Sequence, residues 1–67
     1  MEGVIFKILN DNDRGKDGFL KCNNTEHYFS VSGNSDLTPK IETNTKVLFQ
    51  LIETGEKVSA KIIKIID

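Results

Sequence analysis

Five short apolar segments, each bounded by residues that favour turns, constrain the fold of this 67-residue chain more than any other feature. The segments are rich in β-branched and aromatic residues, and none has the length of a convincing amphipathic helix. They lie at Val4–Leu9, Phe19–Cys22, His27–Val31, Val47–Glu53 and Val58–Ile66. This spacing is typical of a β-barrel or a β-sandwich. We expect one domain over residues 1–67, because so short a chain can bury only one small core.

The polar stretches between these segments predict turns and one long loop. Asn23 and Asn24 tolerate a left-handed backbone, which a tight hairpin turn requires. The stretch Ser32–Thr45 contains several turn residues and only two apolar anchors. Its Pro39 excludes a central strand and favours a loop or a short turn of helix.

The last apolar segment changes the face of its apolar side chains partway along. Val58, Ala60 and Ile62 share one face, whereas Ile63 and Ile65 continue on the other. Such a change predicts a bulge that bends the strand around a barrel corner. The side chains expected to point inward from other strands are Leu20, Phe29, Val47, Phe49 and Leu51. The pattern therefore favours an all-β fold, a five-stranded OB-fold β-barrel.

Composition limits the chemistry that we expect. The net charge of −1 gives no strong basic field for duplex nucleic acid. Cys22 is the only cysteine and His27 the only histidine, too few for a structural zinc site. No constellation of catalytic residues is visible, so we expect neither an enzyme nor a cofactor. The lone cysteine and the lack of a secretory signal or long apolar run predict a cytoplasmic protein without membrane contact.

Several motifs, spread over essentially the whole chain, carry a family resemblance. A Gly-x-Val-Lys-Trp-Phe-Asn strand is similar to Gly3–Leu9, and a Lys-Gly-Phe-Gly-Phe-Ile motif is matched at its end by Gly15–Leu20. An Asp-Val-Phe-Val-His-Phe-Ser motif resembles Glu26–Ser32, and two closing strand patterns are similar to Asn44–Phe49 and Ser59–Ile63. Together these stretches resemble the cold-shock domain family, which implies a barrel that binds single-stranded nucleic acid and keeps RNA unstructured.

The chain departs from this family at several stacking positions. Lys7 stands where the family has tryptophan, and Phe6 where it has lysine. If Leu20 faces the core, strand alternation places Phe19 and Tyr28 on the outer face of neighbouring strands, beside Phe6. Aromatic rings on such a face stack with unpaired bases, and lysine or arginine contacts phosphates. The candidate nucleic-acid-binding residues are Phe6, Lys7, Arg14, Lys16, Phe19, Lys21, Tyr28 and Ser30.

These observations predict weak binding of single-stranded RNA or DNA, as in a cold-shock-like RNA chaperone or regulator. Stacking contributes about 1–3 kcal/mol per base, so three aromatic platforms predict an affinity in the micromolar range or weaker. Two alternatives remain open. In one, Phe6 and Phe19 are core residues only; in the other, the chain is an OB-fold protein–protein interaction module that has lost nucleic-acid binding. We expect a monomer, with a weak dimer as the alternative.

Overall fold

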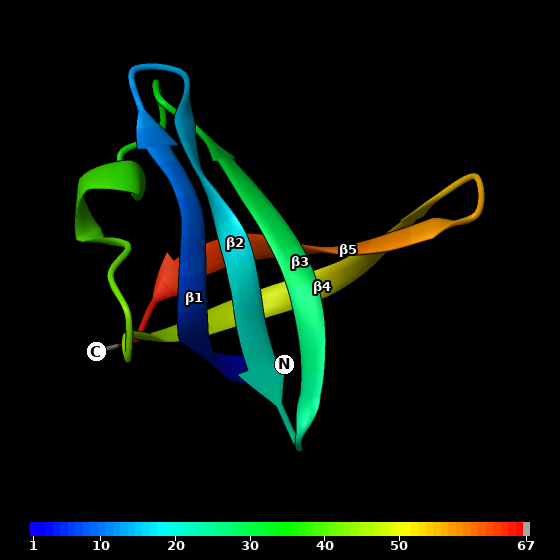
Figure 1. The fold of residues 1–67 in the computed structure, drawn as a ribbon. Coiled ribbons are helices and arrows are strands. Elements are labelled where there is room, and N and C mark those ends of the chain that lie inside the picture. Colours follow the sequence, from blue (N-terminus) through cyan, green and yellow to red (C-terminus); the bar gives the residue numbers. More distant parts are fainter. Residues whose placement is uncertain (67) are drawn as a thin grey trace.

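Five strands and one short helical turn make up the computed structural model, which describes residues 1–66. The first four strands each cover and extend a segment predicted from the sequence, whereas the fifth begins and ends one residue before its predicted segment. The elements, shown in Figure 1, are β1 (Glu2–Asn12), β2 (Gly15–Cys22), β3 (Thr25–Ser32), the 3₁₀ turn η1 (Thr38–Lys40), β4 (Lys46–Thr54) and β5 (Lys57–Ile65).

The strands close into a barrel in the order β1-β2-β3-β5-β4. All pairs are antiparallel except β3 with β5, which are parallel and meet where Phe29 lies opposite Ala60. The first residues of β1 pair with the start of β4 and complete the barrel. The ammonium group of Met1 reinforces this closure by donating to the Phe49 carbonyl at 3.0 Å. The order is that of an OB-fold, and the predicted fold class is confirmed.

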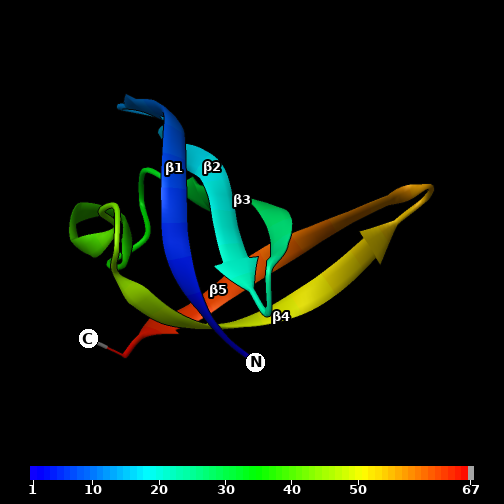
Figure 2. The same ribbon diagram turned by 60° about the horizontal axis from the view of Figure 1, so that its bottom comes forward.

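Alternating residues of the strands fill the barrel, as the sequence pattern predicted for most of them. The largest fully buried side chains are Phe29, Phe49, Ile5, Leu20, Ile41 and Val47. The prediction for Leu51 was wrong, because this side chain is 37% exposed, and Val58 on the same side of the hairpin is 49% exposed. The reason is that the β4–β5 hairpin projects beyond the rest of the barrel, as both ribbon views show (Figures 1 and 2).

The predicted bulge in the last strand is present. Ile62 lies opposite Phe49 and Lys64 opposite Leu48, so Ile63 is the extra residue. Ile62 is buried and Ile63 is exposed, whereas Ile65 packs against the core again. The bulge thus returns the apolar face of β5 to the inside of the barrel.

The hairpin turns have the backbone that their residues favour. Asn23 and Asn24 have φ of 52° and 69° and form a two-residue loop between β2 and β3, as predicted. Gly55 has φ of 63° in the turn between β4 and β5. These turns fix the register of the two hairpins.

The long predicted loop covers one side of the barrel next to β1. Its Pro39 lies in η1, and the following Ile41 is fully buried. Ile5 exchanges backbone hydrogen bonds with Asn44 and Thr45 at 2.8 and 2.9 Å. The loop is therefore a packed part of the barrel wall.

Candidate nucleic-acid interface

A row of three side chains crosses the outer face of β1, β2 and β3. Lys7 lies opposite Phe19, and Phe19 lies opposite Tyr28. The rings of Phe19 and Tyr28 meet edge to face, with centroids 5.9 Å apart. Tyr28 is 39% exposed and Phe19 is half-buried, so both present ring surface to solvent.

A bulge in β1 adds a third aromatic ring to this face. The register shifts between Ile5 and Lys7, which makes Phe6 the extra residue. Because of the bulge, Phe6 and Lys7 are both exposed although they are neighbours in the chain. The ammonium of Lys21 lies 4.0 Å from the centroid of the Phe6 ring, a cation–π contact. The bulge therefore places a ring and a lysine of β1 on the face that carries Phe19, next to Lys21 of β2.

Two carboxylates, Asp17 and Glu26, share this face with the lysines and aromatic rings, and Glu26 lies opposite Lys21. Asp17 lies opposite Ser30, and this pair is two residues along the strands from the pair of Phe19 and Tyr28. Desolvation, together with the charge and hydrogen bonding of Asp17, raises the pKa of Tyr28, while a hydrogen bond with Ser30 opposes the rise. The phenol is consequently neutral at physiological pH and is available as a hydrogen-bond donor or acceptor.

The aromatic pair forms one wall of a groove of about 620 Å³. The projecting hairpin forms the other wall, and the lining residues are Phe19, Tyr28, Thr54, Lys57, Val58 and Ser59. The sequence analysis missed these four hairpin residues, because it placed Val58 only by the face that it shares with Ala60 and Ile62. The polar residues and Gly55 indicate the turn between β4 and β5, but they do not reveal how far the hairpin extends beyond the barrel.

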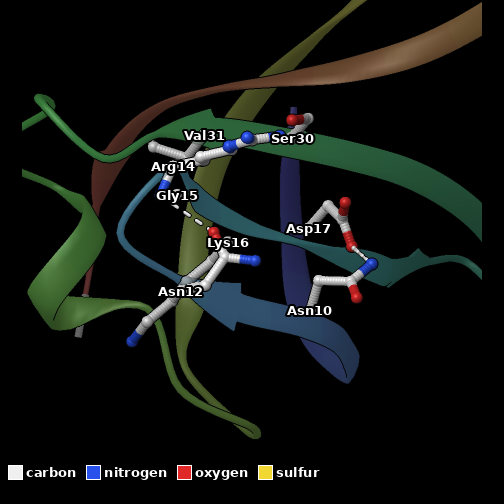
Figure 3. Close-up of a pocket in the computed structure, with 8 residues that line it drawn as sticks. All are labelled: Asn10, Asn12, Arg14, Gly15, Lys16, Asp17, Ser30 and Val31. Carbon is white, nitrogen blue, oxygen red and sulfur yellow. Dashed lines mark hydrogen bonds between the residues drawn. The ribbon is translucent and has the colours of Figure 1, made fainter.

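Arg14 and Lys16 lie apart from the aromatic rings. Arg14 is in the β1–β2 turn, where its backbone N–H donates to the Asn12 side chain at 2.8 Å, and its side chain extends toward Ser30 (Figure 3). Lys16 is turned toward the long loop, where its ammonium donates to the Ile41 carbonyl at 2.9 Å and lies 3.8 Å from Asp11. Its side chain is only 13% exposed. Lys16 therefore holds the loop against the barrel and does not face the groove.

The other predicted residues are brought together on the outer face of β1, β2 and β3. They are Phe6, Lys7, Phe19, Lys21, Tyr28 and Ser30. Among the described residues, no group of three His, Cys, Asp or Glu side chains is placed to hold a metal ion. Cys22 and His27 are half-buried, and the His27 ring packs 5.7 Å from that of Phe49. Within residues 1–66, no helix has the length and apolar character needed to cross a membrane.

Comparison of the chain with protein-family models, with curated proteins and with solved structures finds no match in any of the three. The functional interpretation therefore rests on the geometry of this face and on the chemistry of its side chains.

Proposed function

We propose that the outer face of β1, β2 and β3 binds single-stranded RNA or DNA by base stacking. The observation that carries the proposal is the placement of Phe19 and Tyr28 side by side on paired strands, with solvent-exposed ring surface along a groove. Every base has a π-face, so such rings hold unpaired bases with little regard to sequence. Phe6 supplies a third ring on the neighbouring strand.

Lysines around the rings supply contacts for the phosphates of a bound strand. Lys7 and Lys21 flank the rings on β1 and β2, and Lys57 lines the opposite wall of the groove. A duplex hides its base faces and relies on a larger basic surface than a chain of net charge −1 offers. These features favour a single strand over a duplex as the ligand.

A domain of this kind acts on RNA structure by mass action. It binds an unpaired segment and leaves the paired form unbound, so hairpins shift toward the open form as protein concentration rises. This is the behaviour of a cold-shock-like RNA chaperone or regulator. Three aromatic platforms predict affinities in the micromolar range or weaker, at about 1–3 kcal/mol per stacked base.

The chain provides its own reporter for a binding experiment. Tyr28 is the only tyrosine and the chain has no tryptophan, so intrinsic fluorescence arises from the proposed face. We expect oligo-dT and oligo-U to quench this emission, and to show the same affinity by anisotropy of a labelled strand. Phe19→Ala is expected to weaken binding about fivefold or more, since 1 kcal/mol of lost stacking is about a factor of five.

The matched control is Ile63→Ala. Ile63 is 46% exposed at the β5 bulge and lies outside the lining of the groove. This variant is expected to bind as the wild type does. Absence of binding at low salt and high protein concentration, or equal affinities for the two variants, would refute the proposal.

A second candidate function follows from apolar side chains on the projecting hairpin. Leu51 and Val58 lie on the same side of the hairpin and are each more than a third exposed. Exposed apolar side chains that cluster on one element are typical of protein interaction sites. Amide spectra with and without oligonucleotide separate the candidates: shifts at Phe6, Phe19 and Tyr28 support nucleic-acid binding, whereas their absence supports a protein partner.

A further inference from the structure

A small polar hollow lies next to the aromatic pair on the outer face. Its volume is about 250 Å³. Figure 3 shows it at the end of β2 that follows the β1–β2 turn. The lining residues are Asn10, Asn12, Arg14, Gly15, Lys16, Asp17, Ser30 and Val31.

The carboxylate of Asp17 has a fixed position in this hollow. The Asn10 side-chain amide donates to its Oδ1 at 2.9 Å (Figure 3). The register places Asp17 and Ser30 two residues from Phe19 and Tyr28, which is about 7 Å along the strands. A base stacked at the aromatic pair, or the next base of the same strand, thus presents its edge to Asp17.

Asp17 is unfavourable to a ligand that is bound only through its phosphates. An ionised carboxylate repels phosphates and offers hydrogen-bond acceptors only. It favours a base that presents N–H donors to it. Arg14 lines the same hollow and offers the complementary set, since a guanidinium only donates.

We propose that this hollow is a guanine-selective subsite of the nucleic-acid face. Guanine presents two adjacent donors, N1–H and the 2-amino group, which match the two oxygens of one carboxylate. Its O6 and N7 are acceptors, and arginine pairing with them is the commonest specific contact to guanine in protein–DNA complexes.

The other bases fit the hollow less well. Thymine and uracil present a single N–H between two carbonyl oxygens, which a carboxylate repels. Adenine and cytosine present one amino group next to a ring nitrogen that only accepts. Guanine alone offers the paired donors that a carboxylate binds with both oxygens.

The inference rests on the proposed function, and it is tested with strands that differ in one base. The probes are oligo-dT and the same strand with its central thymine replaced by guanine, adenine, cytosine or hypoxanthine. We expect guanine to strengthen binding about fivefold or more, the lower end of the discrimination typical of a two-point base contact. Hypoxanthine keeps N1–H and O6 but lacks the 2-amino group, so its affinity is expected to fall between those of guanine and thymine.

Asp17→Asn gives the decisive variant. Removal of the negative charge is expected to strengthen binding of plain oligo-dT, while the preference for guanine falls to less than twofold. The control is Glu26→Gln, because Glu26 is an exposed carboxylate on the same face of β3, opposite Lys21, outside the hollow. This control is expected to strengthen oligo-dT binding and to retain the guanine preference. Asp17→Ser provides a second variant, and thermal melting verifies that each variant is folded.

The outcomes separate the two proposals. If oligo-dT binds and guanine gives no advantage, or if Asp17→Asn keeps the full preference, the guanine subsite is refuted and the general nucleic-acid face stands. If no strand quenches Tyr28 or binds by anisotropy, the proposed function itself fails. An equal gain from guanine and adenine would indicate stronger purine stacking and would also refute the subsite.

Discussion

A substitution at Gly18 would disturb the pairing of β1 with β2 beneath the proposed nucleic-acid face. Gly18 is buried in β2 opposite Ile8, between the two register shifts of β1. A Cβ at this position would lie 2.0 Å from the Lys7 carbonyl oxygen, whereas ordinary contact begins at 3.4 Å. Gly18→Ala must therefore displace β1 by about 1.4 Å, and no side-chain rotation relieves a clash with backbone.

The cost of this displacement is large relative to the stability of the domain. Overpacking typically costs about 1–3 kcal/mol, and stretched β1–β2 hydrogen bonds add about 1 kcal/mol each. We expect Gly18→Ala to destabilise the protein by about 3 kcal/mol. A domain of this size has a free energy of unfolding of roughly 3–10 kcal/mol. The melting temperature should fall by about 12–24 °C, at about 4–8 °C per kcal/mol.

Thermal and urea unfolding followed by circular dichroism measure this loss. The control is Gly55→Ala, because no atom lies within 4 Å of a Cβ there and only the φ of 63° opposes the substitution. That backbone conformation costs alanine about 1 kcal/mol. A loss below about 1 kcal/mol in Gly18→Ala, or equal losses in both variants, would show that β1 does not pack against Gly18 as described.

Three further predictions follow from the site. Lys16→Met should lose about 1 kcal/mol of stability, because the Ile41 carbonyl loses its charged donor, and should leave affinity for oligo-dT within about twofold. Folding raises the pKa of Tyr28 above its ordinary 10.0, so the free energy of unfolding should decline as pH rises from about 10 through the folded-state pKa. Asp17→Asn should lower the folded-state pKa of Tyr28, as measured by ultraviolet titration. Lys57→Ala should reduce the slope of log affinity against log salt by about 0.7 if Lys57 contacts a phosphate. An unchanged slope would show that Lys57 of the hairpin does not contact a phosphate of the bound strand.

The sequence predicted the barrel well because the inner faces of its strands are encoded locally. Leu20 and Phe29 follow strict alternation, and the two isoleucines at 62 and 63 reveal the β5 bulge directly. The asparagine pair at 23 and 24 determines the first hairpin turn through its own backbone preference. In each case, neighbouring residues contain the information needed.

The features that the sequence analysis missed depend on contacts between distant segments. The bulge at Phe6 is not marked by a glycine or a turn residue, and it shows only in the register of β1 against β2. Lys16 has the positive charge of a phosphate-binding residue, but its ammonium donates to the carbonyl of Ile41, 25 residues further along the chain. The exposure of Leu51 was missed because alternation gives the side of a strand that a residue occupies, and not whether a second layer covers that side.

The proposed nucleic-acid face carries a small positive charge although the chain has a net charge of −1. Lys7, Lys21 and Lys57 lie around the rings, and Asp17 and Glu26 lie among them, so the five charges leave a local excess of +1. Such a weak field makes electrostatic attraction a small part of the affinity, and stacking must supply most of the rest. A carboxylate then lowers the affinity for all strands only slightly, because electrostatic attraction contributes little of that affinity. It can add discrimination between bases, which a strongly basic face would obscure by binding every strand through its phosphates.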